Sequence, residues 1–170
     1  MVKLTSDAVD KLLDKYNSDI SKLRDKIDSC STYVAAITEN AKELAPEFDF
    51  VATVSQIEEL EKKIIKLKHA RNIFNNTTEV VEGMTVDQVL VRMAMLNRQR
   101  SIYAKMANRL PKERVNSRLS ATKEIEYTYV NYKIEDAKNK SDAVEAEIYK
   151  LRQALNIVNS TVTFDVDIEL

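Results

Sequence analysis

The sequence is poor in the residues that make tight turns, cross-links and metal sites. Its 170 residues include one glycine, two prolines, one cysteine, one histidine and no tryptophan. Turn-rich β folds need many glycines and prolines, so their scarcity favours a helical chain. One cysteine excludes an intrachain disulfide, which fits a reducing compartment. Together with a single histidine, it also excludes a zinc site built from several such ligands of one chain.

The single glycine excludes two common nucleotide-binding motifs. The dinucleotide fingerprint needs three glycines, and the P-loop needs two before its lysine. No apolar run approaches the ~18 residues of a membrane-spanning helix, and the N-terminal residues lack the apolar core of a signal peptide. We therefore expect no membrane association and a cytoplasmic location, in a bacterium or in an infected host cell.

What the sequence does contain is typical of one folded helical protein. Hydrophobic residues make up 44% and charged residues 31% of the chain, which is too apolar for disorder. The length suits a single helical domain over residues 1–170. The formal net charge of −1 gives no reason to expect nucleic-acid binding. We expect no cofactor and no metal.

A long heptad pattern predicts the first helix, at about residues 7–43. Its apolar or small residues alternate in steps of four and three, as along the seam of a coiled coil. They are Val9, Leu13, Tyr16, Ile20, Leu23, Ile27, Cys30, Val34 and Ile37. Such a helix would be roughly 55 Å long at 1.5 Å per residue. It needs a long partner helix from its own chain or from another subunit, so we expect a homo-oligomer.

Three further helices are predicted at about 54–75, 86–110 and 132–158. Thr85 with Gln88 three residues later forms a capping box at the start of the 86–110 helix. Apolar residues recur in steps of three and four along all three segments. Together with the first helix, they predict a long-helix bundle or coiled coil.

Short strands are predicted near 78–82, 124–130 and 161–170. The last has the clearest pattern, because apolar residues alternate strictly with Thr, Asp and Glu. These apolar residues are Val162, Phe164, Val166, Ile168 and Leu170. A single strand is not stable alone, so its partner is one of the other two strands or a neighbouring subunit. The predicted fold class is mainly α (α+β), with four helices and a small sheet.

From residue 64 onward the order of features resembles the septicolysin-like family, a group of uncharacterised small helical bacterial and phage proteins. The matching residues are Leu67, Asn72, Asn75, Thr78, Gly83, Thr85, Val86 and Leu90, then Gln153 and Asn156 near the C-terminus. The chain departs from the family at Met93 and Ala94, where an Arg-Asp pair is usual, and at Ile157, where an aromatic is usual. The resemblance covers most of the chain and implies a helical-bundle fold without a known activity.

Two clusters exceed what a plain helical bundle needs. The first is a run of amide and hydroxyl side chains at Asn72, Asn75, Asn76, Thr77 and Thr78. One left-handed Asn is enough to cap a helix, so the surplus can bind a polar ligand, although capping alone is the simpler interpretation. The second is a basic and aromatic set between residues 92 and 132. Arg and Lys bind phosphate and Tyr stacks on a nucleobase, although for any one of these residues a solvated helix face or an apolar strand face is the favoured interpretation.

The predicted ligand site combines the two clusters. Its residues are Asn72, Asn75, Asn76, Thr78, Arg92, Arg114, Arg118, Lys123, Tyr127 and Tyr129. Three acidic residues of the terminal strand, Asp165, Asp167 and Glu169, can gather a hard cation, but charges on an exposed strand also prevent aggregation. The second interpretation is favoured, as a solvated position is for His69.

The sequence supports a non-catalytic homo-oligomeric helical binding protein. It would sequester a small anionic, nucleotide-like signalling ligand in pockets between subunits. The alternative is a structural or adaptor protein that binds another protein through its coiled-coil helices and C-terminal strand. An enzyme using carboxylates and a metal is disfavoured, because only unpatterned acidic residues support it.

Overall fold

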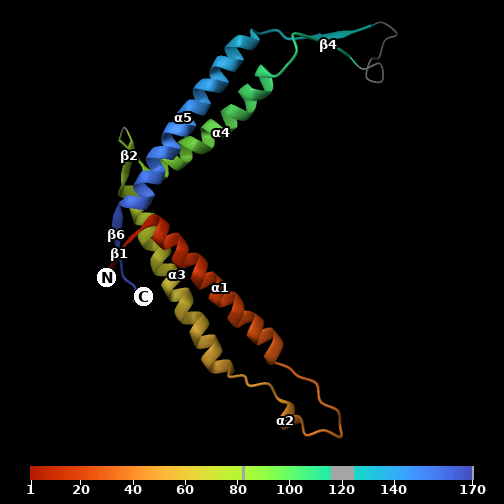
Figure 1. Cartoon of the computed structure of the whole chain (residues 1–170), viewed down its shortest axis with the longest axis vertical. Coiled ribbons are helices and arrows are strands. Elements are labelled where there is room, and N and C mark those ends of the chain that lie inside the picture. Colours follow the sequence, from red (N-terminus) through yellow and green to blue (C-terminus); the bar gives the residue numbers. More distant parts are fainter. Residues whose placement is uncertain (82, 116–124, 170) are drawn as a thin grey trace. The chain divides into compact units, whose positions relative to one another are not determined.

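The computed structural model describes residues 1–81, 83–115 and 125–169 (Figure 1). Its elements follow in the order β1 (Val2–Thr5), α1 (Ser6–Cys30), α2 (Ala41–Leu44), α3 (Phe50–Thr77), β2 (Glu79–Val81), β3 (Met84–Thr85), α4 (Val86–Ala107), β4 (Lys112–Arg114), β5 (Tyr127–Tyr129), α5 (Ile134–Thr161) and β6 (Thr163–Val166). The prediction of a mainly helical α+β fold with four long helices is confirmed.

The chain divides into two compact units. Unit 1 comprises Met1–Thr77 and Ile157–Leu170, and unit 2 comprises Thr78–Asn156. Helix α5 runs through the boundary between Asn156 and Ile157, so it contributes to both. The prediction of a single domain stays a prediction.

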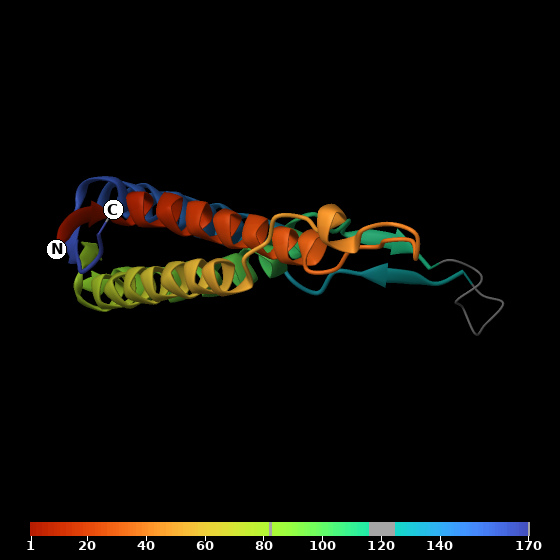
Figure 2. The same cartoon turned by 90° about the horizontal axis from the view of Figure 1, so that it is seen from below.

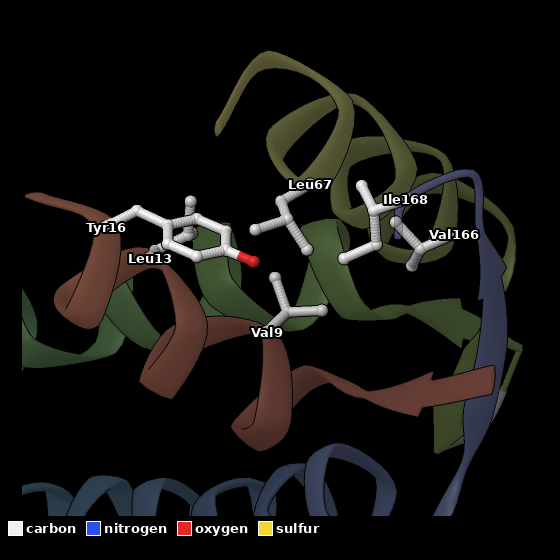
Figure 3. Close-up of a cluster of buried hydrophobic side chains, with 6 residues drawn as sticks. All are labelled: Val9, Leu13, Tyr16, Leu67, Val166 and Ile168. Atoms are coloured by element: carbon white, nitrogen blue, oxygen red, sulfur yellow. The ribbon is translucent and has the colours of Figure 1, made fainter. Parts of the chain in front are cut away.

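Unit 1 is built on the antiparallel pair of α1 and α3, which lie side by side in two perpendicular views (Figures 1 and 2). The Thr5 side chain caps α1 by accepting a hydrogen bond from the Ala8 amide at 3.2 Å. Side chains from α1, α3 and the C-terminal segment point toward one another in the buried cluster of Figure 3. This cluster consists of Val9, Leu13, Tyr16, Leu67, Val166 and Ile168. Each fully buried aliphatic side chain contributes about 1.5–3 kcal/mol.

The partner helix predicted for the first heptad seam is therefore the chain's own α3. Ile20, in the middle of the seam, is only 6% exposed. Arg71, which interrupts the apolar pattern of α3, forms an ion pair with Asp10 of α1. A charged residue at this edge of the helix pair is thus paired with a carboxylate of the facing helix.

The first helix is shorter than predicted, because it ends at Cys30 and not near residue 43. The chain then continues through a loop and the single turn of α2, which the Asn40 side chain caps. Val34 and Ile37 continue the heptad steps, yet both are almost fully exposed. The partner helix begins only at Phe50, so a longer α1 would have no surface to pack against. The Ser, Thr and Val residues at 31–34 also have lower helix propensity.

Helix α3 is longer than the predicted 54–75 at both ends. Its start is fixed by Asp49, whose carboxylate accepts a hydrogen bond from the Ala52 amide at 2.9 Å. Its end at Thr77 lies two residues beyond the predicted end, so the helix includes Asn76 and Thr77. The predicted site residues Asn72, Asn75 and Asn76 therefore lie on the last turns of a helix.

The C-terminal strand forms as predicted, but its partner is one that the sequence did not suggest. Strand β6 pairs antiparallel with β1, with Val2 opposite Val166 and Leu4 opposite Phe164. The strands near 78–82 and 124–130 belong to two other sheets. On β6, the Phe164 ring stacks on Phe74 of α3 with ring centroids 4.6 Å apart. The sheet thus ties the C-terminal segment to unit 1.

Unit 2 contains α4 and the part of α5 up to Asn156, which run side by side in Figure 1. The predicted capping box is present, since the Thr85 and Gln88 side chains each accept from the other's backbone amide. Helix α4 ends at Ala107, three residues before the predicted end, and α5 spans Ile134–Thr161 where 132–158 was predicted.

Two small sheets complete unit 2. Strands β2 and β3 form a tight antiparallel pair around Gly83, whose φ of 73° is a left-handed conformation that suits glycine. Strand β5 pairs with β4, which was not among the strands predicted from the sequence. The prediction of a single small sheet is therefore wrong, because the described strands form three separate two-stranded sheets.

Candidate functional site

The β4–β5 ribbon brings basic and aromatic side chains onto one face. Its register places Lys112 opposite Tyr129 and Arg114 opposite Tyr127. Alternate residues of a strand point to the same side, and paired residues share that side. Lys112, Arg114, Tyr127 and Tyr129 therefore form one surface, which we call the basic–aromatic face. All four side chains are exposed.

The Lys112 side chain of this face lies over the two aromatic rings. The Lys112 ammonium nitrogen lies 3.9 Å from the centroid of the Tyr127 ring and 5.3 Å from that of Tyr129. The two rings are 6.4 Å apart and tilted by 52°. Cation–π contacts of this kind contribute about 0.5–1 kcal/mol at exposed sites. They leave the ammonium hydrogens free to turn toward an anion.

Backbone hydrogen bonds extend the ribbon beyond these strands. The Val115 amide donates to the Glu126 carbonyl at 2.9 Å, and the Val130 amide donates to the Pro111 carbonyl at 3.2 Å. Five consecutive residue pairs thus fix the relative positions of the two strands. The basic–aromatic face is a preformed surface and does not need to be assembled by a ligand.

A small cavity lies at the same end of unit 2, where α4 ends and α5 begins. Its volume is about 190 Å³, and it is lined by Tyr103, Met106, Tyr132, Lys133, Asp136, Ala137 and Lys140. The Tyr132 hydroxyl donates a hydrogen bond to the Met106 carbonyl at 2.8 Å. Sites for drug-sized ligands usually occupy about 300–1,000 Å³. This cavity can take only part of a nucleotide.

The amide and hydroxyl cluster is partly engaged in local hydrogen bonds. The Asn76 side chain donates to the Asn72 carbonyl at 2.9 Å, and the Thr77 hydroxyl donates to the Ile73 carbonyl at 2.8 Å. Thr78 accepts the Val86 amide through its own carbonyl at 3.0 Å. Within unit 2, Thr78 is at the start of α4 and the basic–aromatic face follows its end. The 22 residues of α4 span roughly 33 Å, so Thr78 and Tyr127 do not line one pocket of a single unit.

Arg92 is paired within its own unit. Its Nε and Nη2 atoms donate to the same Glu147 carboxylate oxygen at 2.9 Å and 2.8 Å. This ion pair joins α4 to α5 and fixes their relative register. Arg92 must give up Glu147 before it can bind another anion. The remaining predicted site residues, Arg118 and Lys123, lie outside the described residues.

Of the predicted set, the structure therefore brings together Arg114, Tyr127 and Tyr129. It adds Lys112, which is not among the predicted site residues. The signal for Lys112 was present, because it stands two residues before Arg114 and so shares its side of a strand. That signal required β4 to be recognised as a strand.

Acidic and lysine side chains of unit 1 gather around the end of the C-terminal segment. Asp167 accepts a hydrogen bond from the Lys66 ammonium at 3.0 Å, which lowers the pKa of Asp167 below its ordinary value. The ion pair is therefore complete above the ordinary Asp pKa and is lost as the pH falls further. Within the part of the chain that the structure describes, no group of three His, Cys, Asp or Glu residues is placed to hold a metal. His69 is exposed, as expected.

Among the described residues, none of the helices is both long enough and apolar enough to cross a membrane. No protein-family model matches the chain, and no curated protein matches it. A solved structure does. The chain is similar to a functionally unknown conserved protein from Corynebacterium diphtheriae, with a TM-score of 0.64 over 96% of this chain and 100% of that one. The sequence identity is 17%, so the similarity shows the fold alone.

Proposed function

We propose that the protein is a non-catalytic, homo-oligomeric binding protein that sequesters a small anionic, nucleotide-like ligand at the basic–aromatic face. One observation carries the proposal. Lys112 and Arg114 share a preformed face with two tyrosines, and the Lys112 ammonium lies over both rings. The face therefore offers cations for a phosphate beside aromatic surfaces for a planar base.

The chemistry divides between the two residue types. A phosphate needs cationic donors because neutral groups rarely offset the cost of its desolvation. Arg114 can hold it with two parallel N–H bonds, and Lys112 adds a mobile ammonium. The ring of Tyr129 is the more exposed of the two, at 63% against 42% for Tyr127. We assign the stacking of the base to Tyr129.

We propose an oligomer because the basic–aromatic face would cover only one side of a bound ligand. Small-ligand sites usually bury 70–90% of the ligand, whereas a two-stranded ribbon covers one side only. A second subunit would supply the other side. We therefore place the proposed binding site between subunits, and we limit its residues in one subunit to those of the basic–aromatic face.

Removing a cation from this face is expected to weaken nucleotide binding. For Arg114→Gln or Lys112→Gln, the loss of one charge-assisted hydrogen bond should raise Kd about 10- to 100-fold. Isothermal titration calorimetry with linear and cyclic nucleotides measures this directly. Thr128→Val is the matched control, because Thr128 lies on the opposite face of the same strand and Val keeps strand propensity.

Two results would count against the proposal. One is that no linear or cyclic nucleotide binds the wild-type protein. The other is that the Lys112 and Arg114 variants bind as tightly as Thr128→Val does.

An adaptor function is the second candidate, and the segment between α1 and α3 favours it. Large apolar side chains are exposed there and at the start of α3, namely Tyr33, Val34, Ile37 and Leu44, with Phe50 and Val51 of α3. Exposed apolar patches of this kind are typical of protein-binding sites. The C-terminal strand is a poorer docking element, because β1 pairs with one of its edges. Replacing residues 33–44 by a short Gly-Ser linker would abolish partner binding in this case and leave nucleotide binding intact.

We also propose that the chain belongs with the septicolysin-like proteins. The order of its features supports this, as does its similarity in fold to a conserved bacterial protein. Membership would bring no activity with it. It therefore bears on the origin of the fold and not on the ligand.

A further inference from the structure

The outer face of α4 is unusually apolar for a side exposed to solvent. Val86, Val89 and Leu96 form its buried side. On the opposite side, Val91, Met95 and Ile102 are 48%, 52% and 57% exposed. The steps of four and seven from Val91 to Met95 and Ile102 place these three along one stripe. We call these three residues the α4 stripe.

A helix that is apolar on two opposite sides normally has a partner on each. The inner side of α4 faces α5, to which the Arg92–Glu147 ion pair joins it. The heptad seam of α1, which suggested an oligomer from sequence, is covered by α3 of the same chain. Among the described residues of unit 2, the α4 stripe is thus an apolar helix surface that is not covered by another helix.

The charges at the two ends of the stripe identify the partner. Asp87 lies in the first turn of α4 and Lys105 in the last, and both are exposed. Asp87 is four residues before Val91 and Lys105 is three after Ile102, so both continue the stripe. When two α4 helices pair antiparallel, each Asp87 meets the Lys105 of the other copy. Parallel pairing would place like charges together.

We infer that two copies of this chain associate through their α4 stripes in an antiparallel, two-fold arrangement. The inference rests on the oligomeric part of the proposed function and identifies its surface. A two-fold interface uses the same patch on both subunits, which the opposite charges at the two ends of α4 make self-complementary. Ala94 is opposite Arg98 in this register, and its small side chain leaves room for the guanidinium.

The first test measures the oligomer of the full chain. Light scattering over about 1–100 µM should show a dimer, because one helix pair is a small interface and an affinity on the order of micromolar is expected. Met95→Lys combined with Ile102→Lys should give a monomer throughout. Both positions are exposed in the protomer, so the variant should keep the wild-type circular dichroism spectrum. Ile65→Lys on α3, also an exposed isoleucine, is the matched control and should remain dimeric.

The second test measures the orientation of the two helices. In a Cys30→Ser background, an equimolar mixture of Asp87→Cys and Lys105→Cys proteins should form a disulfide-linked dimer under mild oxidation. Neither protein alone should do so. A dimer of Asp87→Cys with itself would overturn the antiparallel arrangement.

Three outcomes would overturn the interface: a wild-type monomer at 100 µM, a dimer of the Met95 and Ile102 double variant, or dissociation by Ile65→Lys. These outcomes are separate from those of the ligand test. A dimer that binds no nucleotide would support the α4 interface and contradict the ligand. A monomer that binds nucleotide would contradict the α4 interface and support the ligand.

Discussion

Ile20→Lys is expected to unfold unit 1. Ile20 is 6% exposed and lies in the seam that α1 makes with α3. A lysine there must bury an ammonium without a partner, or lose its proton, or push the two helices apart. Unpaired buried charges cost about 3–5 kcal/mol, against a total stability of about 5–15 kcal/mol for a typical protein. We therefore expect a large loss of helical signal near room temperature or a strongly lowered Tm.

The same substitution at an exposed position provides the control. Ile65 on α3 is 66% exposed, so Ile65→Lys should change the stability by less than about 0.5 kcal/mol. Thermal unfolding followed by circular dichroism compares the two variants. If Ile20→Lys melts like Ile65→Lys, then α1 and α3 do not form the pair described.

Truncation after Val162 is the second change with a large expected effect. It removes Phe164 from its stack on Phe74, together with Val166 and Ile168, which are 1% and 5% exposed. It also leaves β1 without its strand partner. Losing one buried aliphatic side chain costs about 2–5 kcal/mol when it is cut back to alanine. The truncated protein should therefore melt at least 10 °C lower, at about 2–4 °C per kcal/mol.

A pair of point variants separates packing from chain length in this experiment. Ile168→Ala should lower the stability by about 2–5 kcal/mol, because it opens a cavity in the buried cluster. Asp165→Asn lies on the exposed side of β6 and should be nearly neutral. A truncated protein with the wild-type Tm would show that the segment is a free tail.

The long helices could be predicted because their information is local. Steps of three and four identify a helix face wherever they occur, and the Thr85–Gln88 box is visible in four consecutive residues. The end of α1 could not be predicted in this way. Val34 and Ile37 continue the pattern, but whether a partner surface reaches them depends on where α3 begins. The heptad pattern identifies residues that can pack against a partner helix, but the length of that partner helix decides which of them are buried.

The strand pairs depend on contacts between distant parts of the chain. The alternation in the last ten residues predicts β6, but its partner β1 is a four-residue strand at the other end of the sequence. The candidate site likewise combines residues that have a local signal with one that depends on pairing between distant segments. Tyr127 and Tyr129 were visible as an alternating pair, while Lys112 became part of the site only through the register of β4 and β5. A register between segments more than ten residues apart has no local signal.

Native mass spectrometry of the freshly purified protein tests the central claim most directly, because it measures the oligomer and any retained ligand together. We expect a species of twice the 19.5 kDa chain mass that carries a small anionic molecule, or gains one when a nucleotide is added. The Lys112→Gln and Arg114→Gln double variant should keep the dimer mass and lose that molecule. A bare monomer whose mass does not change with any nucleotide would contradict both the dimer and the ligand site.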